Sequence, residues 1–223
     1  MEQAMEFDFE QARFNMVEQQ IRPWDVLDPE VLSLLQTLKR EDFVPAAHRA
    51  IALADLEIPL GNGDVMLAPR VEARALQALA VQKNERALEI GTGSGFMAAL
   101  LGSQAAQVVS VELRADLVAT ARANLERAGI ANVTVTQGDG AKGWDKDGSF
   151  DVILLSGGVP VLPEAFLKQL KVGGRLLAFV GEDPLMVAQL VTRTGEETYA
   201  TINLFETVVP QLKNAQPRAK FTF

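Results

Sequence analysis

The chain has 223 residues, of which 48% are hydrophobic and 22% charged, so it can form one globular domain with a small appendage around a sizeable core. Its formal net charge of −8 repels phosphate backbones, and its longest basic cluster is Lys39-Arg40, which excludes nucleic acid as an expected partner. The absence of cysteine and the single histidine, His48, exclude thiol catalysis, disulfides and thiolate or multi-histidine metal sites, so we expect no metal.

The ends and the hydropathy of the chain bear on its location. The N-terminal segment is acidic and lacks the basic start and apolar run of a signal peptide. No apolar stretch is long enough to span a bilayer. We therefore expect a cytoplasmic protein without membrane contact, and the sequence sets no oligomeric state.

The first part of the chain, residues 8–80, reads as mostly helical. Phe14 and Ile21 belong to a pattern with helical spacing that Pro23 ends, and Asp28 is placed to cap a second helix that begins at Pro29. Residues 55–68 hold a proline and two glycines and are predicted to form a loop. A third helix is predicted over residues 69–81.

Strands and helices alternate through the middle of the chain. Strands are predicted at residues 86–90, 108–111, 133–136, 150–155 and 175–180, and helices at 96–101 and 116–128. Residues 186–193 and 198–205 then read as a β-hairpin. The pattern predicts an α/β fold, a Rossmann-like doubly wound and mostly parallel sheet with an N-terminal helical extension and a C-terminal antiparallel hairpin. We expect the extension and a substrate loop in residues 1–80 and the core in residues 81–223.

A glycine-rich turn follows the first strand of this core, in the sequence LEIGTGSGF at residues 88–96. A dinucleotide site requires the spacing Gly-x-Gly-x-x-Gly/Ala, but here the third glycine is Gly95 and Phe96 holds the expected position. Glu89 at the end of the strand would also repel a pyrophosphate. It would attract S-adenosylmethionine, because the sulfonium and ammonium groups of this molecule are cationic. The alternative is a turn that serves only the packing of strand on helix.

Two more acidic residues follow the next two strands. Glu112 comes 19 residues after Gly93 (112 − 93), where a carboxylate can accept both ribose hydroxyls, and the position of Asp139 suits an adenine amino group. Three acids at the carboxyl ends of consecutive strands make S-adenosylmethionine the expected cofactor. The predicted cofactor-binding residues are Glu89, Gly91, Thr92, Gly93, Glu112, Asp139 and Gly140.

These motifs, together with GDG at residues 138–140 and LKQLKVGGRL at 167–176, resemble the protein-L-isoaspartate O-methyltransferase family, a family of class I S-adenosylmethionine-dependent enzymes. MVEQQI at residues 16–21 and REDFVP at 40–45 resemble the helical region that precedes the core of this family, so the resemblance runs from about residue 13 to 212. It implies methylation of the free α-carboxylate of isoaspartyl residues in damaged proteins, a reaction that begins their repair. Isoaspartyl-containing peptides or proteins are then the expected partners.

One part of the chain departs from the family pattern. The active-site serine of the family falls on Leu67, which cannot hydrogen-bond a carboxylate, so no catalytic residue is assigned. The candidate substrate-binding residues are Asp64, Leu67, Arg70 and Ser156. We expect Arg70 to bind the carboxylate in a bidentate contact, unless it is an exposed arginine of a first helical turn. Ser156 either hydrogen-bonds the substrate or the methionine part of the donor, or is only a small residue that allows close approach.

The departure leaves two other functions open. One is a methyltransferase on the same scaffold with a changed, small-molecule acceptor, because Leu67 makes the pocket more apolar. The other is a non-catalytic S-adenosylmethionine-binding module that lost its chemistry with the serine.

Overall fold

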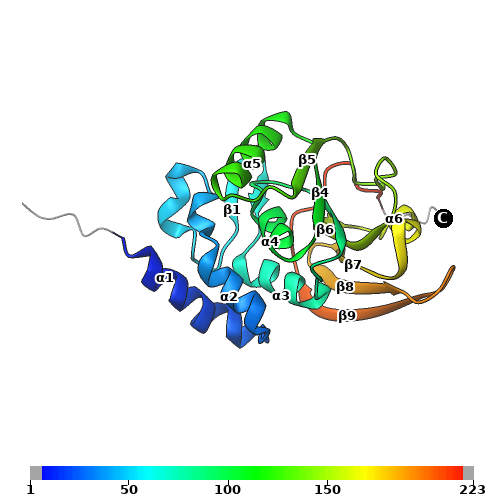
Figure 1. Ribbon diagram of the computed structural model, residues 1–223, viewed down its shortest axis with the longest axis horizontal. Coiled ribbons are helices and arrows are strands. Elements are labelled where there is room, and N and C mark those ends of the chain that lie inside the picture. Colours follow the sequence, from blue (N-terminus) through cyan, green and yellow to red (C-terminus); the bar gives the residue numbers. More distant parts are fainter. Residues whose placement is uncertain (1–6, 218–223) are drawn as a thin grey trace, which may run out of the picture. The chain divides into compact units, whose positions relative to one another are not determined.

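The structure of the protein, a computed structural model, describes residues 7–217. The chain divides into two compact units, Met1–Gln77 and Ala78–Phe223. Both are drawn in Figure 1. The division between an extension and a core at residue 80 stays a prediction.

The first unit is mostly helical, as the sequence predicts. Its helical segments are α1 (Phe9–Asn15), the π-helical turn η1 (Met16–Ile21), the 3₁₀ turn η2 (Arg22–Trp24), α2 (Pro29–Thr37), the 3₁₀ turns η3 (Arg40–Asp42) and η4 (Ala46–Ile51), and α3 (Pro69–Leu79), which continues two residues past the unit boundary. Asp28 caps α2 as predicted, because its side chain accepts hydrogen bonds from the backbone N–H groups of Glu30 and Val31.

The loop predicted for residues 55–68 is wrong in part, because it contains a small β-hairpin. Strands β1 (Ile58–Gly61) and β2 (Asp64–Met66) pair antiparallel around a turn at Asn62 and Gly63. Both turn residues have positive φ, 54° and 79°, which is the backbone that an Asn-Gly pair adopts in a two-residue hairpin turn. Proline and glycine therefore marked a tight turn between two short strands rather than an irregular segment.

The second unit is built on a seven-stranded sheet with the strand order β5-β4-β3-β6-β7-β8-β9. The strands are β3 (Arg86–Ile90), β4 (Gln107–Glu112), β5 (Val133–Gln137), β6 (Phe150–Val159), β7 (Leu170–Glu182), β8 (Leu185–Arg193) and β9 (Tyr199–Thr207). All pairs from β5 to β7 are parallel, and β8 and β9 add an antiparallel hairpin. The predicted Rossmann-like α/β fold is confirmed.

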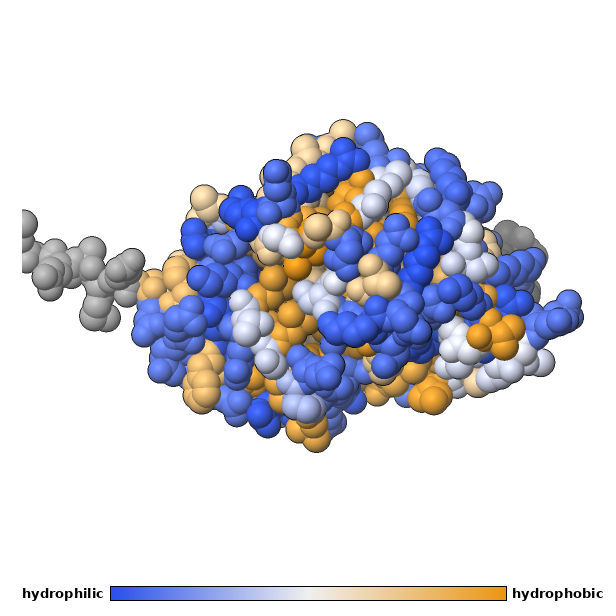
Figure 2. All heavy atoms as spheres, viewed as in Figure 1, coloured by the Kyte–Doolittle hydropathy of each residue, from blue (hydrophilic) through white to orange (hydrophobic). Residues whose placement is uncertain are grey.

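The helices of this unit are α4 (Phe96–Gln104), α5 (Ala115–Arg127) and α6 (Glu164–Gln169). In Figure 1, α4 and α5 lie beside β4 and β5, while α6 accompanies β7. Strand β3 is buried along nearly its whole length, which is typical of a parallel strand that is covered on both faces. Figure 2 shows hydrophilic residues over much of one face of the protein, with hydrophobic residues visible between them.

The order of the strands places the site. The chain runs outward from β3 through β4 to β5, then returns to the other side of β3 with β6. The crevice outside the carboxyl ends of β3 and β6 is thus the topological switch point, where doubly wound sheets bind ligands. In the described part of the chain, no helix has the length and apolar character needed to cross a membrane.

Two strands are longer than predicted. β6 continues past Leu155 through Ser156, Gly157 and Gly158, and β7 begins at Leu170, so that the pair Gly173-Gly174 lies inside it. A Cβ on Gly174 would approach the carbonyl oxygens of Asp151 and Lys171 to 2.9 Å. The glycine pair lies in the irregular stretch between Leu170 and Arg175, where β7 shifts its register against β6. Gly173 supplies a positive φ of 84° there, and Gly174 permits the close approach of backbones.

Candidate active site

The glycine-rich turn leads from β3 into α4. Gly91, Gly93 and Gly95 all have positive φ, of 96°, 53° and 86°, which side chains rarely adopt. A Cβ on Gly95 would lie 3.2 Å from the Cα of Ala121, so this glycine lets α4 begin close against α5. The backbone N–H of Gly91 donates to the carbonyl of Val111 at 2.8 Å, which ties the turn to the neighbouring strand β4.

Glu89, the last but one residue of β3, is fully buried at 0% exposure. Its two carboxylate oxygens accept hydrogen bonds from two serines on the flanking strands. The Oγ of Ser110 on β4 lies 2.6 Å from Oε2, and the Oγ of Ser156 on β6 lies 2.8 Å from Oε1. The Oγ1 of Thr92 lies 2.5 Å from the Oγ of Ser110. The structure thus brings together Glu89, Thr92 and Ser156, and adds Ser110, which sequence reasoning missed.

Glu112, at the end of β4, braces the same turn. Its Oε2 accepts the backbone N–H of Gly93 at 2.9 Å, and its Oε1 accepts the backbone N–H of Arg114 at 2.9 Å. Each oxygen keeps a further lone pair, because a carboxylate oxygen accepts more than one hydrogen bond. The carboxylate can therefore hold the turn and receive ribose hydroxyls at the same time.

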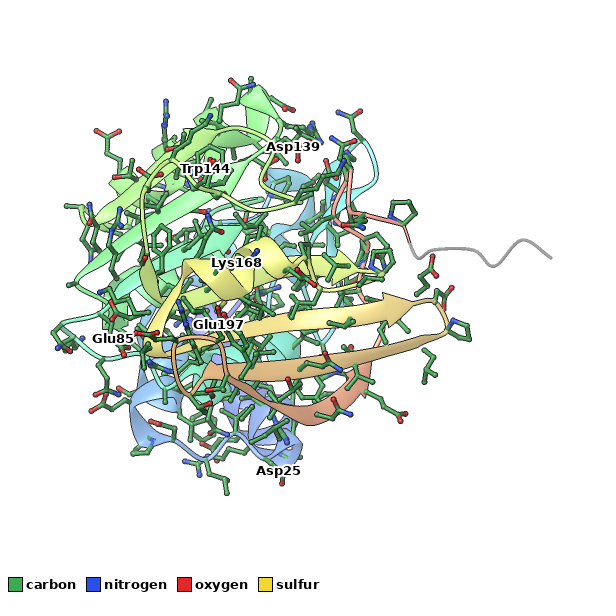
Figure 3. The ribbon with its side chains drawn as sticks, turned by 90° about the vertical axis from the view of Figure 1, so that its right-hand side faces the viewer. Asp25, Glu85, Asp139, Trp144, Lys168 and Glu197 are labelled. Carbon is green, nitrogen blue, oxygen red and sulfur yellow. The ribbon has the colours of Figure 1, made fainter. Side chains whose placement is uncertain are left out.

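Asp139 and Gly140 lie on the loop after β5, where Figure 3 shows Asp139 near Trp144. Asp139 is exposed, and its Oδ1 accepts the backbone N–H of Ala141 at 3.1 Å. A Cβ on Gly140 would lie 2.7 Å from the Cδ1 of Ile90, so the loop reaches the end of β3 only because this residue has no side chain. The Oδ2 of Asp139 accepts a hydrogen bond from the Nδ2 of Asn214 at 2.9 Å.

Asn214 belongs to a C-terminal segment, residues 208–215, that sequence reasoning missed. The backbone N–H of Gly158 donates to Pro210 at 2.9 Å, and that of Leu212 donates to Gly158 at 2.8 Å. The side chain of Leu212 lies 3.1 Å from the place where a Cβ on Gly91 would be. The segment therefore runs from the end of β6 past the glycine turn to Asp139. The pair Gly157-Gly158 was the available signal, since two residues without side chains leave room for another chain.

The substrate candidates Asp64, Leu67 and Arg70 lie in the first unit. Leu67 is 8% exposed, and its carbonyl accepts a hydrogen bond from Nη2 of the buried Arg40 at 2.5 Å. Arg40 also donates from Nε to the carbonyl of Ala52 at 2.9 Å and forms an ion pair with the buried Glu72. Burial raises the pKa of Glu72 to about 7, although the guanidinium of Arg40 lowers it. Arg40 thereby fixes the backbone that carries Leu67.

Arg70 already has partners in the first unit. Its Nη1 lies 2.6 Å from Oδ2 of Asp55, and its guanidinium lies 4.2 Å from the centre of the Trp24 ring. The pair is partly exposed, so the guanidinium keeps donors for a further group. Asp64 begins β2 and pairs with Gly61 in the hairpin.

Comparisons with known proteins decide which family this arrangement belongs to. The family model "Protein-L-isoaspartate(D-aspartate) O-methyltransferase (PCMT)" matches residues 11–214. The chain belongs to this family. A protein-L-isoaspartate O-methyltransferase of Koribacter versatilis is 39% identical over 81% of this chain and 82% of its own length. One of Marinobacter nauticus is also 39% identical, over 86% of this chain and 88% of its own.

Solved structures agree with the family on the fold. A protein-L-isoaspartate O-methyltransferase structure has a TM-score of 0.76 and 26% identity, over 92% of this chain and 67% of the other. A protein from Plasmodium falciparum described as a putative member of the family has a TM-score of 0.77 over 93% of this chain and 99% of the other, and its 21% identity bears on the fold alone. The predicted family is thereby confirmed, while the roles of individual site residues stay predictions.

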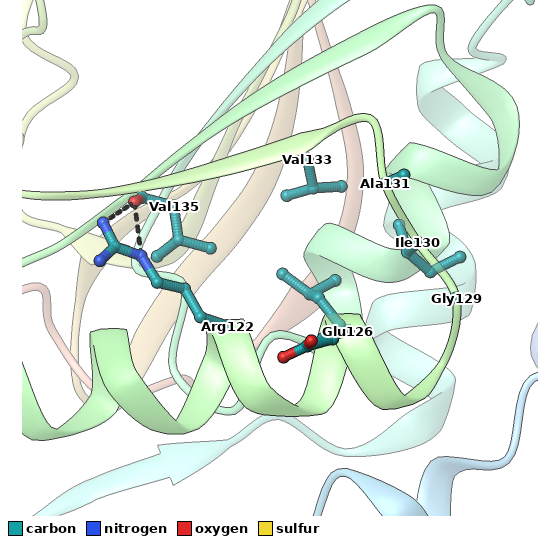
Figure 4. A pocket seen from close by; sticks show the side chains of 8 residues that line it. Arg122, Glu126, Gly129, Ile130, Ala131, Val133 and Val135 are labelled. Carbon is teal, nitrogen blue, oxygen red and sulfur yellow. Dashed lines mark hydrogen bonds between the residues drawn. The ribbon is translucent and has the colours of Figure 1, made fainter.

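A separate cavity of about 310 Å³ lies beyond the predicted site of this family member (Figure 4). It lies between α5 and the edge strand β5, and its lining includes Leu125, Ile130 and Val133 but none of the predicted site residues. To one side of the other lining residues, Nη2 of Arg122 donates to the carbonyl of Val135 at 2.6 Å (Figure 4). Among residues 7–217, no three His, Cys, Asp or Glu side chains gather in a way that could hold a metal ion.

Proposed function

We propose that this protein is an S-adenosylmethionine-dependent O-methyltransferase that methylates the free carboxylate of isoaspartyl residues in damaged proteins and peptides. The observation that carries the proposal is the family match over residues 11–214, which includes the helical first unit as well as the α/β core. The relatives with 39% identity, which are named for this activity, match most of the chain as well.

The residues at the carboxyl edge of the sheet fit S-adenosylmethionine. Gly91 and Gly93 let the backbone come close to a ligand, and Glu89, Glu112 and Asp139 give the edge a negative charge that suits a cationic nucleoside. In this proposal Glu112 accepts hydrogen bonds from the ribose hydroxyls, and Asp139 accepts one from the adenine amino group on a lone pair that its bonds to Ala141 and Asn214 leave open. When bound, S-adenosylmethionine supplies a methyl group that is activated by its attachment to a sulfonium.

The chemistry of the methyl acceptor determines what the protein has to contribute to catalysis. A carboxylate is ionised at neutral pH, so it needs no general base, and the chain has to position it and exclude water. Leu67 cannot give the carboxylate the hydrogen bond that the family serine would give, so the positioning falls to another side chain. Arg70 is the proposed carboxylate ligand, and Asp55 and Trp24 hold its guanidinium until the substrate arrives.

A second function, a changed acceptor, is favoured by one observation. The side chain of Leu67 is buried and its backbone is held by Arg40, so this position presents no hydroxyl to a peptide carboxylate. A small and less polar acceptor would be more compatible with a leucine at this position. We further propose a cytoplasmic location. The net charge of −8 supports the proposal that the protein has no nucleic-acid partner.

Transfer of a labelled methyl group tests the proposal. The folded protein with S-adenosylmethionine should label an isoaspartyl peptide but not its aspartyl twin of the same sequence. If the protein binds the donor and labels neither peptide, isoaspartyl activity is refuted. Transfer to a member of a small-molecule panel would then establish the changed acceptor, and donor binding without any transfer would establish a binding module.

A further inference from the structure

The buried carboxylate of Glu89 accepts hydrogen bonds from two serine hydroxyls, and a third hydroxyl, that of Thr92, bonds one of these serines. A carboxylate without exposure to water is costly unless hydrogen bonds replace its hydration. Here Ser110 supplies one bond from β4, at 2.6 Å, and Ser156 supplies the other from β6, at 2.8 Å. The two bonds reach the two oxygens from opposite sides of β3, so the carboxylate group is fixed in orientation as well as in place.

The register of the sheet explains why these hydroxyls meet. Glu89 is the direct partner of Ser110 across β3 and β4, which puts both side chains on one face. On the other side Glu89 is the partner of Leu154, and Ser156 lies two residues further along β6, on the same face again.

The hydroxyl of Thr92 fixes the direction of the hydrogen bonds that lead to Glu89. Ser110 has a single hydroxyl proton, and it is given to the carboxylate of Glu89. At 2.5 Å from the Oγ of Ser110, Thr92 is therefore the donor of that pair. A relay Thr92 → Ser110 → Glu89 links the glycine turn to the buried acid.

The order of the strands indicates which end of the donor this cluster faces. Asp139 follows β5 and Glu112 ends β4, and the proposed function gives them the adenine and the ribose. Continuing in the same direction along the sheet edge, the next two strands are β3 and β6, which carry Glu89 and Ser156. Glu89 and Ser156 therefore face the remaining part of the donor, which is its amino-acid end with the ammonium group.

We infer that Ser156 and Ser110 are positioning residues that hold the Glu89 carboxylate toward the ammonium end of the methyl donor. The inference rests on the proposed function for its donor but not for its acceptor. Ser156 thus serves donor binding rather than the binding of the substrate carboxylate. Glu89 acts on the ammonium directly or through the hydroxyl of Ser156.

Two ligands that differ in this end test the inference by calorimetry. S-adenosylhomocysteine carries the ammonium group, whereas 5′-methylthioadenosine keeps the adenosine and the sulfur and lacks the amino-acid part. Ser156→Ala should lower the affinity for S-adenosylhomocysteine by roughly 5- to 20-fold, because one charge-assisted hydrogen bond is lost. The affinity for 5′-methylthioadenosine should change by less than about 2-fold. Ser156→Thr keeps the hydroxyl and should restore most of the affinity.

Controls separate positioning from a loss of structure. Ser103→Ala removes a hydroxyl that bonds only within α4, to the carbonyl of Ala99, and should leave both affinities unchanged. Ser110→Ala should reproduce the selective loss, and a thermal melt of each variant checks that it is folded. An equal loss for both ligands in Ser156→Ala, or no loss for either, would overturn the inference.

Failure of the proposed function gives a different result. A wild-type protein that binds S-adenosylhomocysteine but methylates no isoaspartyl peptide refutes the acceptor and leaves the positioning role to be judged by the two ligands. A wild-type protein that does not bind S-adenosylhomocysteine overturns both.

Discussion

The sheet edge of the second unit and the hairpin region of the first unit satisfy their charged groups in opposite ways. At the sheet edge, carboxylates accept hydrogen bonds from hydroxyls and backbone N–H groups, as Glu89 and Glu112 do. Around the hairpin, guanidinium groups meet carboxylates, in the pairs Arg40–Glu72 and Arg70–Asp55. The first arrangement keeps a net negative charge ready for a cation, while the second is neutral by itself.

This difference separates the two halves of the proposed reaction. The donor side owes its affinity to charges that need no rearrangement, so its mutants should change donor binding alone. The acceptor side has charges that are already paired, so its mutants should change stability or the use of the peptide.

The largest expected effect is on stability and comes from Glu72. Its pKa is raised by burial from its usual 4.5 to about 7, so the folded protein binds more protons than the unfolded chain between these values. The free energy of unfolding should therefore fall as the pH rises from about 4.5 to 7, by up to about 3 kcal/mol. Urea unfolding of wild type and Glu72→Gln at a series of pH values measures it.

The glutamine variant cannot titrate at this position, so its stability should change less over the same window. Parallel curves for the two proteins would contradict the assignment. Donor affinity should be the same in both.

On the donor side, Glu112→Ala should have the next largest effect. It removes the acceptor of the Gly93 and Arg114 backbone N–H groups together with the proposed ribose contact. Affinity for S-adenosylhomocysteine should fall by roughly 10- to 100-fold, or about 1–3 kcal/mol, in calorimetry. Glu126→Ala removes an exposed acid of α5 and is the matched control. Equal affinities for all three proteins would show that Glu112 does not bind the donor.

A substitution at Leu67 tests the acceptor side of the site. Leu67→Ser returns a hydroxyl to the position where the family has serine, and kcat/KM for an isoaspartyl peptide should rise by about 10-fold, the value of one hydrogen bond to a charged group. Affinity for S-adenosylhomocysteine should stay unchanged. The loss of a buried leucine will lower the melting temperature. A folded variant without any gain would favour the changed acceptor.

The smallest effect is expected for Arg70→Ala. KM for the isoaspartyl peptide should rise by roughly 3-fold with kcat little changed, because Asp55 competes with the substrate for the guanidinium in the wild type. Arg49→Ala removes another arginine that is paired with an aspartate of the first unit, Asp42, and should leave KM as it is. The same KM in all three proteins would rule out Arg70 as a substrate ligand.

The sequence predicted the fold well where one signal dominated. The strand at residues 86–90 was placed correctly because it ends abruptly in a glycine-rich turn that leads into a helix. The extension of β6 through Gly157 and Gly158 could not be predicted, because glycine is a poor strand former and these two residues are accommodated by the C-terminal segment. The glycine pair signals that another segment comes close, but nothing in the local sequence identifies a partner segment more than 50 residues away.

The same limit applies to the site. The three acids at the strand ends were found from strand order and charge, since parallel strands place their carboxyl ends on one edge. Ser110 was missed because a serine within a buried strand gives no sign of its partner until the register with Glu89 is known. The contact of Asn214 with Asp139 was missed for a similar reason, since the two lie 75 residues apart.

Competition between S-adenosylmethionine and NAD at the sheet edge tests the central claim most directly. The wild-type protein should bind S-adenosylmethionine in calorimetry, and an excess of NAD should not displace it, because Glu89, Glu112 and Asp139 attract a cationic nucleoside and repel a pyrophosphate. Saturable binding of NAD, with none of S-adenosylmethionine, would contradict the account.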